Sequence, residues 1–253
     1  MIHYKSASEL AKMRRSARIL ADTILRVMDA VAPGRSTADL DAAAEELIRA
    51  AGAVSNFKGY RGTYPATICT SVNDEIVHGI PSATRVLAEG DLLSLDFGCI
   101  WEGFHSDSAV SLFVGGVAPS PEAERLVKVT EAALDAAVAA VVPGARLSDI
   151  GAAIEGVATP EGLGIVREYG GHGIGRAMHE DPFIQNYGPA GRGPALKPGL
   201  TVALEPMLNL GGEETRLLAD DWTVVTADGS LSAHFEHTVA VTEDGHEILT
   251  ARG

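Results

Sequence analysis

The order of turns, apolar runs and acidic residues in this chain occurs twice, and this repetition restricts the folds that the chain can adopt. The helix-breaking dipeptide Pro33-Gly34 recurs as Pro143-Gly144, 110 residues further along. In each half a glycine is followed six residues later by an acid that ends an apolar run, and a second acid stands shortly before another such run. These acids are Asp96 and Asp107 in the first half and Glu205 and Glu236 in the second. Single matches of this kind arise by chance, but three in the same order favour a duplicated fold.

Apolar periodicity predicts the same series of elements in both halves. Apolar residues at three- and four-residue steps indicate helices over 6–31, from Ser36 or Thr37 to about 51, over 121–142 and over 148–158. Short apolar runs divided by turns indicate strands over 66–71, 92–97, 109–114, 200–204, 222–226 and 238–242. We therefore predict a single α/β (α+β) domain over residues 1–253, with pseudo-repeat halves of about 6–116 and 117–249.

Composition and charge narrow the functional classes. Hydrophobic residues make up 46% of the chain, which is enough for a sizeable core and too much for a disordered protein. No apolar run approaches the roughly 20 residues of a membrane span, and the first residues lack a secretory signal pattern, so we expect a cytoplasmic protein. The net charge of −14 argues against a nucleic-acid binder, and it indicates either a solvated acidic surface or carboxylates that hold cations. Cys69 and Cys99 are expected to be reduced, buried thiols.

The four acids at matching positions are the first candidates for a metal site. Ionised carboxylates at the ends of buried strands are costly unless they are paired or bound to metal. A salt bridge is the alternative for each acid taken alone. However, the chain has 20 basic residues against 34 acids, and none of the basic residues stands in these apolar runs. Four acids in pseudo-symmetric positions therefore favour a metal site.

Two histidines stand in segments that have an unusual backbone. Glycines are too dense for a helix around His172, in EYGGHGIGRAMHEDP, and they let the backbone pass closely around its ring. A dinucleotide loop is the competing interpretation, but this pattern is not a GxGxxG that opens a helix. His78 follows an apolar strand and precedes a Gly-Ile-Pro turn, where a structural histidine is an equal alternative. Four carboxylates and a histidine are the composition of a two-metal hydrolytic site, in which cations about 3.5 Å apart activate water. The sequence contains no HExxH, GxSxG or Walker A motif.

Six segments together resemble one enzyme family. They are VHGIP, LLSLDFG, HSDSAVSLFVG, GGHGIGRAMHEDP, LEPML and SAHFEHTVAVT, and in this order they closely resemble the type I methionine aminopeptidases. The resemblance extends from about residue 6 to residue 249, and the joint pattern is highly specific. It implies the pita-bread fold, a pseudo-two-fold α/β domain with helix–helix–strand halves around a central antiparallel sheet, and it implies the short bacterial form.

The resemblance also implies a ligand set and catalytic residues. Asp96, Asp107, His172, Glu205 and Glu236 match the ligands of two divalent cations, with Asp107 and Glu236 as bridging carboxylates. Glu205 also matches the residue proposed as general base or proton shuttle. Since oxygen ligands with one histidine accept Co, Mn, Fe or Zn, the ligand set does not identify the metal.

Two further histidines and a pocket are implied in the same way. His78 and His179 match histidines that contact the substrate, one near the scissile amide nitrogen and the other near the developing oxyanion. The pocket positions fall on Phe57, Tyr60, Cys69, Met178 and Trp222. Core packing is the alternative for each of the five, and the residues alone favour it for Phe57 and Met178. Phe57 stands where many bacterial members have a cysteine, and Met178 where they have an aromatic residue.

The resemblance implies metal-dependent removal of the initiator methionine from nascent polypeptides with a small second residue. We expect a monomer that meets its substrate at the ribosome and binds neither nucleic acid nor membrane directly. Xaa-Pro peptidases and creatinase-like enzymes share the fold and the five ligands, but they usually carry an extra N-terminal domain. A non-catalytic pita-bread module or a cation-storing protein would also account for the cluster of acids, and peptide cleavage separates both from an enzyme.

Overall fold

The computed structural model describes residues 1–252, which form four α-helices and four antiparallel β-sheets. The helices are α1 (Ala7–Met28), α2 (Thr37–Ala50), α3 (Pro121–Ala139) and α4 (Leu147–Ala158). All four predicted helices are confirmed. The Ser36 side chain accepts a hydrogen bond from the Asp39 amide, so Ser36 rather than Thr37 is the N-cap of α2. Gly34 and Gly144 adopt φ values of 87° and 89°, which explains why the Pro-Gly pairs separate the helices of each pair.

The strands are short apart from one long hairpin. The four-stranded sheet contains β1 (Val54–Ser55), β4 (Leu92–Trp101), β2 (Ile68–Val72) and β5 (Phe104–Phe113). The five-stranded sheet has the order β15 (His246–Ile248), β14 (His237–Val241), β9 (Thr201–Leu204), β7 (Gly171–Gly173) and β8 (Glu180–Ile184). The two three-stranded sheets are β13 (Ser232–His234), β10 (Met207–Asn209) and β6 (Gly164–Ile165), and β11 (Thr215–Leu217), β12 (Val224–Thr226) and β3 (Glu75–Val77).

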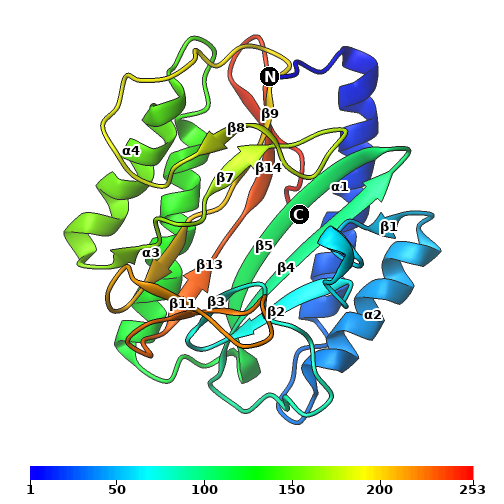
Figure 1. Ribbon diagram of the computed structural model, residues 1–253, viewed down its shortest axis with the longest axis vertical. Helices are drawn as coiled ribbons and strands as arrows, with labels where there is room; N and C mark the ends of the chain where they lie inside the picture. The colour runs from blue at the N-terminus through cyan, green and yellow to red at the C-terminus, as the bar shows by residue number, and fades with distance from the viewer. Residues whose placement is uncertain (253) are drawn as a thin grey trace.

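The two helix pairs lie on opposite sides of the molecule, behind the strands (Figure 1). Helix α1 packs against β4 and β5, whereas α3 packs against α4 and against β9, β10 and β13. One hydrophobic cluster includes Leu20 of α1, Leu95 of β4, Leu134 of α3 and Val202 of β9, all buried. The helix pairs therefore share one core, and the other face of the long strands is left for a site.

Strands from the two halves of the chain meet at β5 and β14. The amide of Glu236 donates to the carbonyl oxygen of Ala109 at 3.0 Å, and the amide of Ala109 donates back at 3.3 Å. The Thr238 hydroxyl donates to the carbonyl oxygen of Asp107 at 2.8 Å and accepts from its amide at 3.0 Å. These bonds hold Asp107 and Glu236 next to each other.

The predicted positions of Asp96 and Asp107 relative to the strands are wrong. Asp96 was expected to end a strand and Asp107 to precede one, but both lie inside the hairpin of β4 and β5. The strands continue to a tight turn at Glu102 and Gly103, whose φ values are 48° and 77°. The backbone pairing continues past both acids, whose side chains point into a shared pocket. The apolar run alone therefore underestimates the length of the two strands.

The glycine-rich segment around His172 forms the short strand β7, which the sequence did not predict. A Cβ atom on Gly171 would lie 2.4 Å from the carbonyl oxygen of Ala203, and one on Gly173 would lie 2.2 Å from that of Asp181. Neighbouring backbones thus approach so closely on both sides that only glycine fits beside His172. The expected close backbone approach is confirmed.

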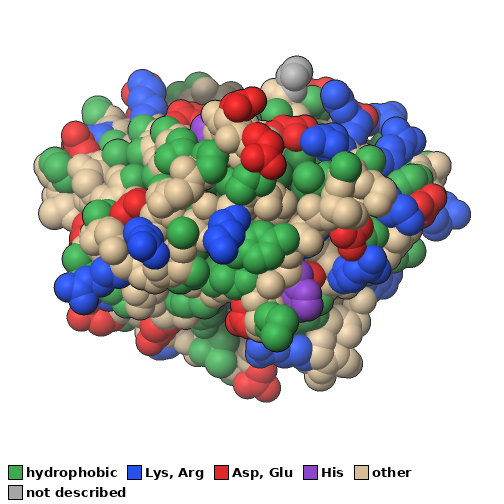
Figure 2. Space-filling model, turned by 90° about the horizontal axis from the view of Figure 1, so that it is seen from above, with side chains coloured by type: hydrophobic (Ala, Val, Ile, Leu, Met, Phe, Trp, Pro, Cys, Tyr) green, Lys and Arg blue, Asp and Glu red, His purple; other side chains and the backbone are tan. Residues whose placement is uncertain are grey.

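The expected state of the cysteines is confirmed, since Cys69 and Cys99 are free and buried. Within residues 1–252 no helix is long and apolar enough to span a membrane. On the face seen in Figure 2, acidic and basic side chains lie among hydrophobic ones.

Two glycines of α4 offer a matched test of the packing. A Cβ atom on Gly151 would lie 2.4 Å from the carbonyl oxygen of Gln185, whereas one on Gly156 would meet no atom within 4 Å. We expect Gly151→Ala to lower the free energy of unfolding by about 2 kcal/mol or more through overpacking. Gly156→Ala should raise it by up to about 1 kcal/mol through helix propensity. Urea denaturation of both variants checks this, and equal shifts would contradict the close approach of α4 to residues 185–187.

Candidate functional site

The five predicted ligands line one pocket, although they come from five separate segments. Asp96 lies in β4 and Asp107 in β5, and Asp96 pairs with Ala109, two residues from Asp107. The two aspartates therefore project from the same face of neighbouring strands. His172 lies in β7, and Glu205 directly follows β9. Glu236 directly precedes β14.

Three of these residues form the tightest group. One ligand atom of each of Asp107, His172 and Glu236 lies within 4.8 Å of those of the other two, and all three residues are buried. His172 Nε2 lies 3.5 Å from Oε1 of Glu205. Burial, and then the charges of Asp96 and Glu205, raise the pKa of Asp107 well above its ordinary value. Asp96 and Glu205 thus lie close enough to complete the group.

The four acids are buried close together, and their negative charges are of the kind that bound cations would compensate. Burial raises the pKa of Asp96 to about 7 and holds those of Asp107, Glu205 and Glu236 well above their ordinary values. In the described part of the chain, none of them forms a salt bridge with lysine or arginine. Asp96 Oδ1, Asp107 Oδ1 and Glu236 Oε1 are buried without a hydrogen-bond partner among residues 1–252. Because such oxygens are costly unless a positive charge compensates them, the residues fit divalent cations.

His172 is oriented as a metal ligand. Its Nδ1 lies 2.9 Å from the carbonyl oxygen of Gly173, which can only accept, so Nδ1 carries the proton. The lone pair of the neutral ring is then on Nε2, the atom that faces Glu205. Burial, followed by the charge of His179, lowers the pKa of His172 to about 3, which keeps the ring neutral.

The two other predicted histidines face the same pocket. His78 directly follows β3 with a φ of 61°, and its ring packs edge-on against Tyr169 and Trp222. The ring of His179 lies 4.2 Å from that of His172, centroid to centroid, and its Nδ1 lies 2.9 Å from the Tyr60 hydroxyl. Burial lowers the pKa of His78 to about 4 and also lowers that of His179. Both rings are therefore neutral at pH 7.

The five predicted pocket residues gather beside the acids. Phe57, Cys69 and Met178 form a buried cluster, against which Tyr60 and Trp222 pack. All five line a cavity of about 250 Å³ that also reaches the acids and the histidines. Phe57 and Met178, for which core packing was the favoured alternative, are lining residues and do not belong to the main core.

Several lining residues were missed by the sequence analysis. Tyr64 is buried, and its hydroxyl donates to the carbonyl oxygen of Ile68 at 3.0 Å, so its ring forms a wall of the pocket. Phe183, Tyr169 and Arg61 also line it. His234 is buried, and its Nε2 lies 3.9 Å from Oε2 of Glu205, opposite His172. The match of His234-Phe-Glu236 to His105-Ser-Asp107 was the available signal for His234.

Comparison with known proteins identifies the family. The model of metallopeptidase family M24 matches residues 11–243. The chain belongs to metallopeptidase family M24. It is 49% identical to methionine aminopeptidase 1 of Mycobacterium tuberculosis, over 99% of this chain and 95% of that protein. The structure of the methionine aminopeptidase of Thermotoga maritima superposes with a TM-score of 0.96 at 40% identity and covers 99% of both chains.

A more distant solved structure shows how far the fold extends. The prolidase of Pyrococcus horikoshii superposes with a TM-score of 0.76 at 18% identity, and this chain covers 64% of it. That likeness shows the fold alone. The predicted fold class, the pita-bread α/β fold, is confirmed by the near-complete superposition on the methionine aminopeptidases. M24 membership also makes the chain a metallopeptidase that uses divalent metal.

The raised pKa values predict how the metal-free protein responds to pH. A carboxyl whose folded pKa exceeds its unfolded pKa binds its proton more tightly in the folded state, so stability is lost as pH rises through the folded pKa. Buried histidines act in the opposite direction, because unfolded histidine is about half protonated at pH 6.5 whereas the pKa values of folded His78, His172 and His234 are about 4 or lower. The contribution of Asp96, with a pKa of about 7, is therefore measured against Asp96→Asn: between pH 6.5 and 8 the metal-free wild type should lose on the order of 1 kcal/mol of stability relative to this variant.

Divalent metal should reverse this loss, because cations replace the protons of the ligands. We expect the rise in Tm on addition of Mn²⁺ to be larger at pH 8 than at pH 6.5. Thermal melts in EDTA and in Mn²⁺ at both pH values measure it. A metal-free wild type that loses no stability relative to Asp96→Asn over this range would show that the acids are not crowded.

Proposed function

We propose that this M24 enzyme is a methionine aminopeptidase that removes the N-terminal methionine from polypeptides whose second residue is small. The observation that carries the proposal is the juxtaposition of the five candidate ligands with a 250 Å³ cavity lined by aromatic and sulfur-containing side chains. The likeness to methionine aminopeptidases over almost the whole chain supports it.

Two divalent cations would be held by Asp96, Asp107, His172, Glu205 and Glu236. When bound, they would supply Lewis acidity and a water activated near neutral pH. In this proposal both cations would share the carboxylates of Asp107 and Glu236. These two residues lie in the tight group, and hydrogen bonds between β5 and the start of β14 hold them next to each other.

Glu205 is proposed to move the proton during hydrolysis. Its two carboxylate oxygens lie 3.5 Å from Nε2 of His172 and 3.9 Å from Nε2 of His234. A buried carboxylate of raised pKa can accept a proton from water and return it to the leaving amine.

His78 and His179 are proposed to contact the peptide on either side of the scissile bond. Both are neutral, and a neutral imidazole can donate a hydrogen bond to an oxyanion or accept one from the amide nitrogen. When Tyr60 donates to Nδ1 of His179, the Nε2–H of His179 is the donor available to the substrate oxygen.

The cavity is proposed to hold the methionine side chain. Phe57, Tyr60, Cys69, Met178 and Trp222 give it apolar and polarisable walls, which suit a thioether. Nascent polypeptides at the ribosome are the proposed substrates, and a cytoplasmic monomer is the proposed form of the enzyme.

Cleavage of three peptides tests the function. The protein, loaded in turn with Fe, Mn and Co, is given Met-Ala-Ser, Met-Leu-Ser and Ala-Pro-Ser. We expect methionine from the first peptide alone. Cleavage of the third instead would assign the chain to the Xaa-Pro peptidases, and metal binding without any cleavage would favour a binding module.

A further inference from the structure

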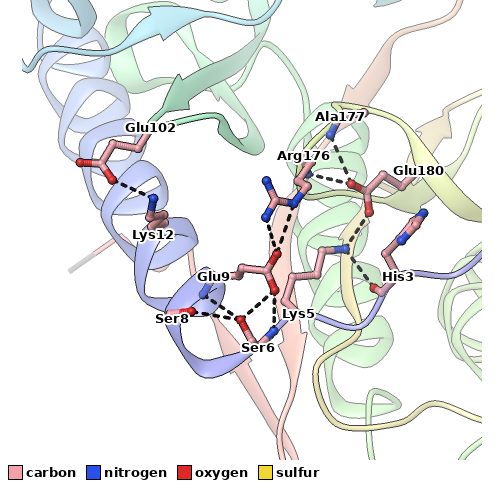
Figure 3. A network of polar contacts seen from close by, with 10 residues as sticks. All are labelled: His3, Lys5, Ser6, Ser8, Glu9, Lys12, Glu102, Arg176, Ala177 and Glu180. Carbon is pink, nitrogen blue, oxygen red and sulfur yellow. Dashed lines mark hydrogen bonds and ion pairs between the residues drawn. The ribbon is translucent and has the colours of Figure 1, made fainter.

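His179 is followed by a buried acid that binds the loop carrying it. Glu180 begins β8, and the side chain of Glu180 is 9% exposed. Its Oε1 accepts hydrogen bonds from the amides of Arg176 at 2.7 Å and Ala177 at 3.2 Å (Figure 3). The carboxylate therefore closes the loop 176–180 on itself, directly beside a proposed catalytic histidine.

The other oxygen of Glu180 binds a buried lysine from the start of the chain. Lys5 Nζ lies 2.7 Å from Oε2 of Glu180, and the side chain of Lys5 is 4% exposed (Figure 3). The backbone amide of Lys5 donates to the carbonyl oxygen of Gly199 at 2.7 Å, which fixes the segment before α1 against the start of β9. Lys5 is thus anchored independently of the loop.

The loop is shaped to admit this lysine. A Cβ atom on Gly175 would lie 2.3 Å from Cε of Lys5, so a side chain at this position would exclude the lysine stem. The amide of His105 donates to the carbonyl oxygen of Gly175 at 2.8 Å and holds this end of the loop. The absence of a side chain at Gly175 and its hydrogen bond to His105 thus leave room for the buried Lys5 side chain.

Stability alone does not explain a buried ion pair, because the desolvation of both charges offsets most of their attraction. The position of the pair does explain it. His179 touches Tyr60 through one ring nitrogen and lies beside His172, so a small shift of its backbone would break this geometry. We propose that the ion pair of Lys5 and Glu180 positions His179 for the reaction. Both are positioning residues, and the inference rests on the proposed role of His179.

The same loop offers a matched control. The guanidinium of Arg176 binds Glu9 of α1 at 2.9 Å on the exposed side of the loop, and the side chain of Arg176 is 70% exposed (Figure 3). Exposed pairs contribute little. Arg176→Gln removes this contact and leaves the backbone amide that binds Glu180.

The test compares Lys5→Met, Glu180→Gln, the double variant Lys5→Met/Glu180→Gln and Arg176→Gln. We expect kcat for Met-Ala-Ser to fall about 10- to 100-fold in the first three variants, with KM and Mn²⁺ affinity within about three-fold, because misplacement of a catalytic group has this cost. The double variant should regain most of the Tm lost by Lys5→Met, since no unpaired charge stays buried, but should not regain kcat. Arg176→Gln should keep kcat within about two-fold.

A double variant that recovers both Tm and kcat would overturn the inference and leave the pair a purely structural one. If Lys5→Met fails to fold, Glu180→Gln decides alone, because glutamine keeps the shape and can still accept from both amides. The ¹⁵N signals of the His179 ring in the metal-free protein give a readout that does not depend on activity. They should broaden or shift in Glu180→Gln, and an unchanged spectrum would also overturn the inference. A wild-type protein that cleaves no methionyl peptide would instead contradict the proposed function.

Discussion

Glu205→Gln should leave the protein folded and lower kcat about 10²- to 10⁴-fold, the range expected for loss of a general acid–base group. Glutamine keeps the shape of the side chain that lies between His172 and His234, so the packing should not change. The amide cannot take up a proton, and the transfer to the leaving amine is lost. Steady-state kinetics at saturating Mn²⁺ measures the effect.

The control for Glu205→Gln is Glu168→Gln. Glu168 also lines the pocket but is exposed, and its carboxylate accepts a hydrogen bond from the Thr215 hydroxyl. Its loss should change kcat by less than about three-fold. Activity of Glu205→Gln near that of the wild type would remove Glu205 from the mechanism.

Asp107→Asn should abolish measurable activity and make the metal-free protein more stable, by about 1–3 kcal/mol. Asp107 lies in the tight group, and the charges of Asp96 and Glu205 both act on it. An uncharged amide relieves the repulsion but is a poor bridge between two cations. A gain in stability with a loss of function is typical of residues kept for a site.

Thermal melts with EDTA and with Mn²⁺ test this prediction. For Asp107→Asn the two melts should nearly coincide, whereas for the wild type Mn²⁺ should raise Tm by several degrees. Asp135→Asn, an exposed residue of α3, is the control and should behave as the wild type. A metal-free Asp107→Asn protein less stable than the wild type would show that the carboxylate is stabilised without metal.

Much of the fold could be predicted because the signals are local. Capping serines begin α1, α2 and α3, the Pro-Gly pairs separate the helices of each pair, and the three- to four-residue apolar steps run within each helix. All four helices are where these signals indicate. The long hairpin was underestimated, since Asp96 and Asp107 interrupt the apolar pattern, whereas β4 and β5 pair through the backbone up to the turn at Gly103.

The site was predictable to the extent that its residues follow motifs. The repeat and the family resemblance marked all five candidate ligands, and the structure brings them to one pocket. His234 and Tyr64 were missed because their importance comes from contacts across the fold: His234 faces Glu205, and Tyr64 packs on Trp222 with ring centroids 5.0 Å apart. The pairing of Lys5 with Glu180 spans 175 residues, and no local pattern indicates it.

The central claim is that five residues hold two divalent cations next to the methionine pocket. Anomalous diffraction from crystals of the Mn²⁺-loaded protein tests it directly. The account predicts two manganese peaks in the pocket, both within coordination distance of Asp107 and Glu236, one completed by Asp96 and the other by His172 and Glu205. A pocket without manganese at saturating Mn²⁺, or manganese bound only at the acidic surface, would contradict it.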